Sequence, residues 1–77
     1  ERAEASLRRL GFDDLRVRHH GDTARVEVPL SRLADVVALR REVVDAVLGA
    51  GYRYATLDLE GLRSGNLNAA LGDPPLS

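Results

Sequence analysis

The sequence predicts an α+β domain with the order helix, strand, strand, helix, strand, in which two helices cover one face of a mixed three-stranded sheet. Apolar residues recur at helical spacing in residues 1–10 and 32–48. They alternate with polar residues in residues 15–20, 23–30 and 52–60, which is typical of half-buried strands. A turn joins the first two strands, and a helix connects the second to the third, which favours a parallel pair there.

Residues 1–10, ERAEASLRRL, form the first predicted helix. Ala3, Leu7 and Leu10 lie three or four positions apart and therefore share one helical face. Gly11 follows at a position where helices commonly end on a glycine. We therefore expect a helix that ends near residue 10 and packs its apolar face against the sheet.

Residues 15–30 form the predicted hairpin. Gly21-Asp22, a two-residue turn with glycine first, joins the alternating stretches LRVRHH and TARVEVPL. This turn sets the register, because the residues on either side of it must face each other. The facing pairs are then Arg18 with Arg25, Arg16 with Glu27, Val17 with Val26, and Leu15 with Val28.

Residues 32–48 form the second predicted helix, a single amphipathic helix of about four to five turns. Ser31 precedes it as an N-cap, and Gly49 and Gly51 end it. In the third strand, residues 52–60, the side chains expected to face the core are Ala55, Leu57 and Leu59. The domain should then span residues 1–62, followed by a tail at 63–77 that forms one helical turn at 66–71 and ends in a frayed segment.

The composition limits the classes of function. The 77-residue chain has 11 basic and 12 acidic residues and a net charge of −1, which argues against nucleic acid and other polyanions as general partners. It has no cysteine, so disulfides and thiol chemistry are excluded within it. No apolar run approaches the roughly 20 residues needed to span a membrane, and we expect a cytoplasmic protein. Because small domains usually need an additional stabilising element, we expect the C-terminal part of a longer protein, stabilised by its parent or by an oligomer interface.

The second face of the predicted sheet carries polar side chains from all three strands. They are Arg16, Arg18, His20, Arg25, Glu27, Tyr54, Thr56 and Asp58. Arg16 opposite Glu27 forms an ordinary opposite-charge pair, whereas Arg18 opposite Arg25 places two like charges together. A bound anion, a carboxylate from a partner, or extension of both side chains into water would each relieve this repulsion. Arginine matches the oxygens of phosphate and carboxylate especially well.

The sequence gives weaker signals for metal binding and catalysis. His19 and His20 are adjacent on a strand and point to opposite faces, so they cannot bind one ion together. We expect His19 at the edge of the core with a hydrogen-bonded ring, and His20 as a candidate metal ligand or acid–base group. The acids Glu4, Glu27 and Asp35 lie on three elements, and their spacing does not say whether they converge. No nucleophile–base set, Walker loop or catalytic carboxylate pair is visible, so we expect the chain alone to be non-catalytic.

Two stretches of the chain resemble a known family. RVRHHGDTARVEV spans residues 16–28 and RREVVDAVLGAGYRYATLDLEGLRSGNLN spans residues 40–68; the TLDLEG-x-RSG segment is the most specific part. Together they resemble the C-terminal domain of the ATP-dependent sacrificial sulfur transferases of the LarE family, which belong to the PP-loop ATP pyrophosphatase superfamily.

The resemblance implies a parent enzyme with an N-terminal PP-loop domain that lies outside this chain. That domain would bind ATP and Mg and adenylylate a pyridine-carboxylate mononucleotide, whose thiolation leads to the nickel-pincer nucleotide cofactor. The sulfur would come from a protein cysteine or from an iron–sulfur cluster, and both options stay open. The implied partners are the nucleotide-monophosphate substrate, the PP-loop domain and further copies of the chain, with no nucleic acid and no membrane.

The resemblance also implies roles for individual residues. Arg16 and Arg18 match the family's arginines near the substrate phosphate, and Arg25 faces Arg18 from the neighbouring strand. The positions that match acids tied to activity, or to binding of an unspecified metal at a subunit interface, are Glu27, Asp35 and Glu4.

Two alternatives to this enzyme interpretation remain. A free-standing module would dock a carboxylate-bearing partner on its sheet face without catalysis. A small metal-binding domain would use His20 with Glu27 or Asp35. Partner binding that persists in high phosphate would favour the first alternative, and a gain in stability with a divalent metal would favour the second.

Overall fold

The computed structural model describes residues 2–62 and confirms the predicted α+β fold class. The elements are, in order, α1 (Arg2–Arg9), β1 (Arg16–His20), β2 (Thr23–Glu27), the short 3-10 helix η1 (Leu30–Arg32), α2 (Leu33–Ala38), α3 (Arg40–Gly49) and β3 (Tyr54–Leu57). The predicted tail at 63–77, with its helical turn at 66–71, lies outside the described residues.

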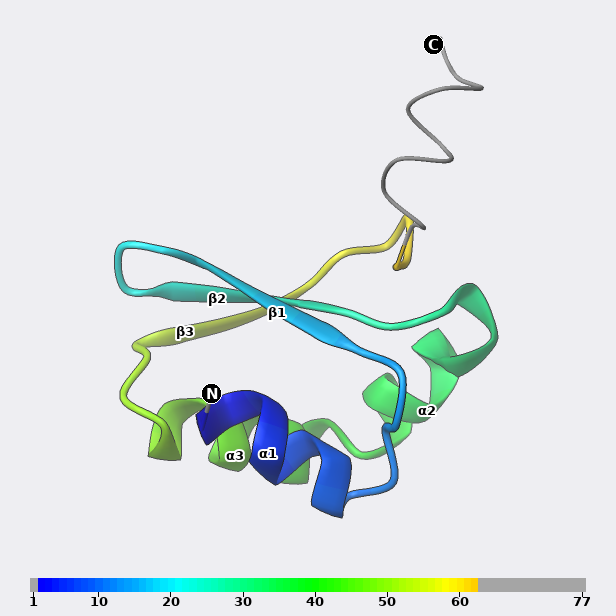
Figure 1. Ribbon diagram of the computed structural model, residues 1–77, viewed down its shortest axis with the longest axis horizontal. Helices are drawn as coiled ribbons and strands as arrows, with labels where there is room; N and C mark the ends of the chain where they lie inside the picture. Colours follow the sequence, from blue (N-terminus) through cyan, green and yellow to red (C-terminus); the bar gives the residue numbers. More distant parts are fainter. Residues whose placement is uncertain (1, 63–77) are drawn as a thin grey trace, which may run out of the picture.

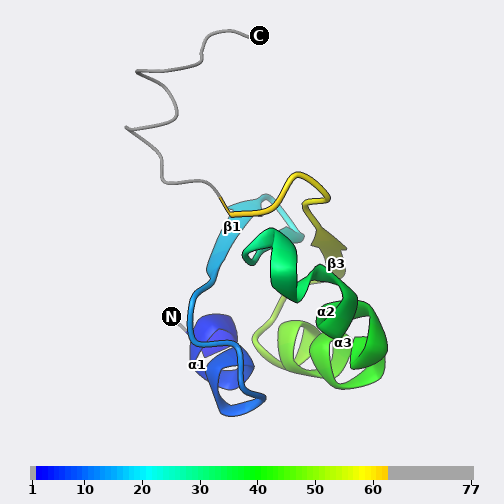
Figure 2. The same ribbon diagram turned by 90° about the vertical axis from the view of Figure 1, so that its right-hand side faces the viewer.

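The strands form one mixed sheet with the order β1-β2-β3. β1 and β2 pair antiparallel, and β2 and β3 pair parallel, as expected for a tight turn and a helical connection. Figure 1 shows α1 and α3 together beneath the sheet, and Figure 2 shows α2 on the same side. The described helices therefore cover one face of the sheet and leave the other to the polar side chains.

The hairpin has the predicted register. Gly21 adopts a positive φ of 57° in the turn, and the facing pairs include Val17 with Val26 and Arg18 with Arg25. The two valines are 7% and 2% exposed. A slip of one residue would move both of them to the open face, so the buried valines and the turn specify the same register.

The prediction of one continuous second helix is wrong, because the chain forms two helices, α2 and α3, that meet at Leu39. Leu39 has φ −101° and ψ 28°, outside the helical range. A continuous helix would place Arg40 about one turn after the buried Val36, on the side facing the core. In the structure Arg40 is exposed. Ser31 is also not the predicted N-cap, since it lies inside η1 and α2 begins without a side-chain cap.

The third strand is shorter than the predicted stretch of residues 52–60 and ends at Leu57. Leu59 was predicted to face the core, but it lies beyond the strand and is 75% exposed. The chain turns here because the N–H of Glu60 donates to Oδ1 of Asp58 at 2.9 Å. Aspartate commonly accepts such a bond from the backbone two residues on, a turn signal that the alternating pattern obscured.

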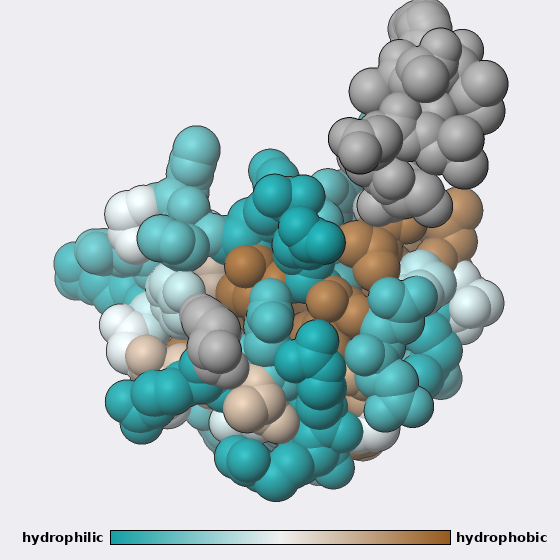
Figure 3. All heavy atoms as spheres, in the orientation of Figure 1, coloured by the Kyte–Doolittle hydropathy of each residue, from teal (hydrophilic) through white to brown (hydrophobic). Residues whose placement is uncertain are grey.

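The core lies between the covered face of the sheet and the helices. Its largest fully buried side chains are Phe12, Leu7, Val26, Val28 and Val47. In Figure 3, hydrophilic residues cover most of the visible face, and hydrophobic residues emerge in a band that runs toward the last described residues. No helix within residues 2–62 is long and apolar enough to cross a membrane.

Candidate functional site

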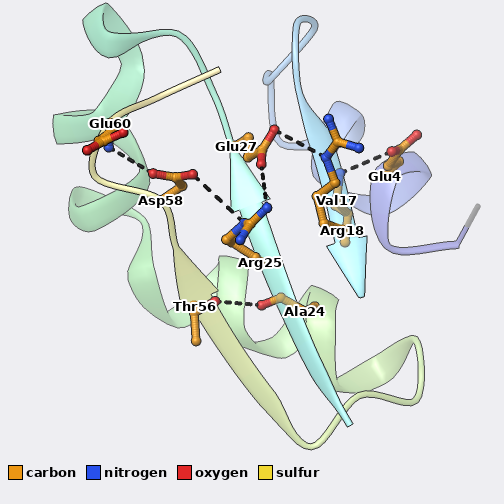
Figure 4. Close-up of polar contacts among 9 residues, drawn as sticks. All are labelled: Glu4, Val17, Arg18, Ala24, Arg25, Glu27, Thr56, Asp58 and Glu60. Carbon is orange, nitrogen blue, oxygen red and sulfur yellow. Dashed lines mark hydrogen bonds and ion pairs between the residues drawn. The ribbon is translucent and has the colours of Figure 1, made fainter. Parts of the chain in front are cut away.

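A chain of ion pairs crosses the open face of the sheet from β1 to the end of β3 (Figure 4). Oε1 of Glu27 lies 3.6 Å from Nε of Arg18, and Oε2 of Glu27 lies 3.2 Å from Nη2 of Arg25. Nε of Arg25 in turn lies 3.8 Å from Oδ2 of Asp58. We call these four residues the arginine–carboxylate chain. The period-two alternation of the strands places them together, because Arg18, Arg25 and Glu27 all occupy open-face positions.

The position of Glu27 explains how the facing arginines are tolerated. Its side chain is only 9% exposed, whereas those of Arg18 and Arg25 are each 53% exposed. One buried carboxylate therefore offers one oxygen to each of two half-exposed guanidinium groups, which offsets their repulsion. The anion that compensates the two arginines is the carboxylate of Glu27 in the same polypeptide. The like-charge pair therefore does not require a partner's carboxylate or a bound ion.

The predicted pairing of Arg16 with Glu27 holds for the backbone register but not for the side chains. The two residues face each other across the strands. Among residues 2–62, however, the ion pairs of Glu27 go to Arg18 and Arg25. Arg16 is exposed on the same face as Arg18, two residues along β1. Within the described residues, Glu27 therefore neutralises Arg18 and Arg25 rather than Arg16.

Asp58 is a member of the site that the sequence analysis placed on this face but gave no role. Its backbone N–H donates to the carbonyl of Val26 at 2.9 Å, which holds it against β2. Its carboxylate reaches both Arg25 and the N–H of Glu60. Next to it on β3, the hydroxyl of Thr56 donates to the carbonyl of Ala24 at 3.0 Å. The sequence signal for Asp58 was the alternation of polar and apolar residues, which places residues 54, 56 and 58 on one face.

A hollow at the hairpin end of the charged face is lined by Arg18, His19, His20 and Arg25. Its volume is about 230 Å³. None of its lining residues is acidic, and all four side chains can donate hydrogen bonds. We call it the basic hollow.

The three acids assigned by the resemblance do not converge within one chain. Oε2 of Glu4 accepts the N–H of Val17 at 3.1 Å, and Oε1 lies 3.6 Å from Arg8. Asp35 pairs with Arg32 at 2.8 Å, whereas Glu27 pairs with Arg18 and Arg25. No group of three or more His, Cys, Asp or Glu residues within 2–62 is arranged to hold a metal ion. Each acid thus has a partner inside the chain.

The alternation puts His19 and His20 on opposite faces of β1, yet both residues line the basic hollow, and His19 is not buried at the core edge. His19 and His20 are both exposed. The ring of His19 lies 6.4 Å from the ring of Tyr52, at a tilt of 48°. His20 extends from the open face near Arg18.

The fold and the charged face together define a class: a small α+β domain that presents preordered arginines on an uncovered sheet. No family model matches the chain. It is 46% identical over 69 residues to pyridinium-3,5-bisthiocarboxylic acid mononucleotide synthase of Lactiplantibacillus plantarum, a match that covers 90% of the chain and 25% of that protein. It is also 43% identical over 72 residues to the uncharacterized protein slr1717 of Synechocystis, covering 91% of the chain and 27% of that protein.

The chain spans about a quarter of the length of the curated relatives it matches. The resemblance to the LarE family is thereby confirmed for this segment, and its length is consistent with a C-terminal domain.

Proposed function

We propose that the chain is the substrate-side domain of a cytoplasmic, ATP-dependent sulfur transferase that acts in nickel-pincer cofactor synthesis. The observation that carries the proposal is the 46% identity, over 90% of the chain, to a synthase named for a pyridinium bisthiocarboxylic acid mononucleotide. A mononucleotide carries a phosphate, and arginine is the side chain best suited to bind one in a bidentate way.

The exposed arginines of β1 are the residues that would meet this phosphate. Arg16 and Arg18 are two residues apart on one face, and Arg25 faces Arg18 from β2. Glu27 neutralises part of this charge from below, while the side chains of Arg18 and Arg25 stay half exposed. The arrangement supports binding and orientation of an anionic substrate rather than bond formation.

The bond-forming steps would belong to a PP-loop domain of the parent with ATP and Mg. The pyridine carboxylate would attack ATP, release pyrophosphate and become an acyl adenylate. A cysteine thiolate would then displace AMP to form a thioester, and loss of the Cα proton with cleavage of the Cβ–S bond would leave the thiocarboxylate on the substrate and dehydroalanine in the protein. In the cluster-dependent alternative, a sulfide would displace AMP and give the thiocarboxylate directly. Either the cysteine or the iron–sulfur cluster would lie elsewhere, since this chain has no cysteine.

Contact with the parent domain or with further copies of the chain is the second part of the proposal. An apolar groove of about 220 Å³ lies between α2, α3 and β3, and Val37 and Val44 at its walls are 58% and 36% exposed. Exposed apolar surface of this kind is typical of interfaces. A metal at Asp35 would need ligands from another copy, because within residues 2–62 no acidic cluster forms around it.

The test is ATP-dependent thiolation of the pyridine-carboxylate mononucleotide by the natural protein that contains this chain. Arg16→Ala and Arg18→Ala should each lower kcat/KM at least about tenfold, chiefly through KM. Arg41→Ala, an exposed arginine of α3, is the matched control and should leave kcat/KM unchanged. Absence of thiolation with all substrates present, or equal activity of the β1 variants and wild type, would contradict the proposal.

A further inference from the structure

We propose that the outer edge of β3 and the apolar groove beside it form a strand-addition site, which takes an extended segment from the remainder of the parent polypeptide. The segment would carry apolar side chains at alternate positions and a carboxylate placed to meet Arg40. The site follows from a strand edge, a groove and an arginine; that its occupant belongs to the same polypeptide rests on the proposed function.

β3 is an edge strand, since among the described strands only β2 pairs with it. The N–H of Asp58 donates to the carbonyl of Val26 at 2.9 Å, which fixes the side of the chain that faces β2. Backbone groups alternate between the two sides of a strand, so the N–H and C=O groups of Ala55 and Leu57 point outward. Among residues 2–62 these outward groups have no hydrogen-bond partner. They are placed to pair with a further strand.

The opposite edge of the sheet is already occupied. There the outward N–H of Val17 donates to Oε2 of Glu4 at 3.1 Å, so a carboxylate from α1 takes the position that a neighbouring strand would use. Within the described part of the chain, no side chain bonds to the outer edge of β3 in this way. Proteins commonly protect the sheet edges that must not pair. The unprotected edge of β3 is therefore the one suited to an interface.

The groove beside this edge supplies apolar surface for an added strand to bury. α1 lies under β1, whereas α2 and α3 lie on the β3 side and form the groove of about 220 Å³ with that strand (Figure 2). Ala55 and Leu57, on the covered face of β3, are only half-buried. Their neighbours on β2, Ala24 and Val26, are 0% and 2% exposed, so the helices cover β3 less completely. Every second side chain of an added strand would point into the groove.

Arg40 gives the occupant a charge requirement. Among the described residues that line the groove, it is the only charged one. It is exposed and has no ion pair within residues 2–62, in contrast to Arg18, Arg25 and Arg32. When an apolar segment excludes water from the groove, a carboxylate is the group that best satisfies this guanidinium. The occupant should therefore carry an aspartate or glutamate beside its apolar residues.

The length of the relatives favours a segment of the same polypeptide. The chain covers 25% and 27% of the two curated relatives, so most of a parent of that kind lies outside it. A tethered segment has a high effective concentration and competes well with free partners. The rival occupants are a second copy of the chain and residues 63–77.

The test is amide hydrogen exchange, measured residue by residue in the 77-residue chain and in the natural protein that contains it. In the chain alone, Ala55 and Leu57 should exchange at least about tenfold faster than Thr56, whose N–H faces β2. These rates should be the same in dilute and in concentrated solution. In the natural protein, Ala55 and Leu57 should be protected as strongly as Thr56.

Substitutions in the natural protein test the charge requirement. Arg40→Glu should raise the exchange rates of Ala55 and Leu57 at least about tenfold, because the new carboxylate repels that of the occupant. Arg41→Glu makes the same change at the next position, which is exposed but does not line the groove, and is the matched control. It should leave both rates unchanged. If Thr56 is unprotected in the chain alone, so that the chain does not fold by itself, the comparison of these two variants decides.

The other outcomes would overturn the inference. Protection of Ala55 and Leu57 in the chain alone would assign the edge to residues 63–77 if it is independent of concentration, and to a second copy if it rises with concentration. No protection in the natural protein, or equal rates in Arg40→Glu and Arg41→Glu, would leave the edge without the proposed occupant. Intact thiolation without protection would refute this site and leave the proposed function standing; protection without thiolation would do the reverse.

Discussion

Two adjacent cross-strand pairs of the hairpin, here called rungs, are stabilised by different interactions. In the first rung, Val17 and Val26 face each other on the covered side of the sheet and belong to the core. In the next rung, Arg18 and Arg25 face each other on the open side with half-exposed side chains. The helices that cover the first pair exclude water from it. The second pair depends on the carboxylate of Glu27, which comes from β2 of the same hairpin.

The two faces of the same strands therefore have different roles: the covered face stabilises the fold, and the open face is available for binding. Burial of apolar surface on one face stabilises the hairpin, so the opposite face can carry like charges that would weaken a free-standing sheet. Glu27 is the exception, because it serves both purposes. It is an open-face residue by position, yet it is 7% exposed, and it holds the arginines apart and in place.

Val17→Asp should have the largest effect. The substitution puts a carboxylate among apolar side chains that supply no partner, and the loss should be about 3 kcal/mol or more, enough to unfold a domain of this size. Thermal melting by circular dichroism measures it. His20→Asp, which adds the same group to the exposed face of the same strand, is the control and should melt like wild type. A cooperative melt for Val17→Asp at the wild-type temperature would mean that the two faces are assigned the wrong way round.

Glu27→Ala should rank second, with a loss of about 1–2 kcal/mol. It leaves two guanidinium groups facing each other, but both are half exposed, so water screens much of the repulsion. Urea denaturation measures the loss. The carboxylate acts on the arginines, so the same substitution should cost clearly less in an Arg18→Ala background. An equal cost in both backgrounds would assign Glu27 a packing role instead.

Residue 27 also shows where the sequence stops being informative. The register could be predicted because the glycine turn and the alternation of Val17 and Val26 impose the same pairing. Alternation also placed Glu27 correctly on the open face. It could not show that the carboxylate leans toward Arg18 and Arg25 rather than toward Arg16 directly opposite, since side-chain direction along the sheet depends on rotamers and on burial.

The helical half of the fold was less predictable for a related reason. The apolar spacing from Leu33 to Leu48 fits one helix, yet Arg40 falls where that helix would meet the core. The chain breaks at Leu39 instead. Arg40 was the available signal, but a pattern of apolar residues alone does not weigh the cost of burying a charge against the cost of bending a helix.

Glu4→Ala tests the backbone of the valine rung and should cost about 1 kcal/mol. Oε2 of Glu4 accepts the N–H of Val17 on the outer edge of β1, where no further strand of residues 2–62 pairs with it. Removal leaves a partly buried donor without its acceptor. The amide of Val17 should exchange with solvent faster in the variant, measured by NMR. Asp45→Ala, on the exposed side of α3, is the control; unchanged exchange at Val17 in Glu4→Ala would show that water replaces the carboxylate without cost.

Arg18→Ala should have the smallest effect on stability, within about 0.5 kcal/mol in urea denaturation. Its contact with Glu27 is long at 3.6 Å and the side chain is half exposed, so the lost attraction is offset by relief of the repulsion from Arg25. The same variant of the natural protein should nevertheless lower kcat/KM for thiolation at least about tenfold, because one of the arginines proposed to bind the substrate phosphate is gone. A stability loss approaching that of Val17→Asp would make Arg18 structural and remove the distinction between the two rungs. A small loss of stability together with a weakened interaction with substrate would mean that Arg18 serves binding and that the fold does not depend on it.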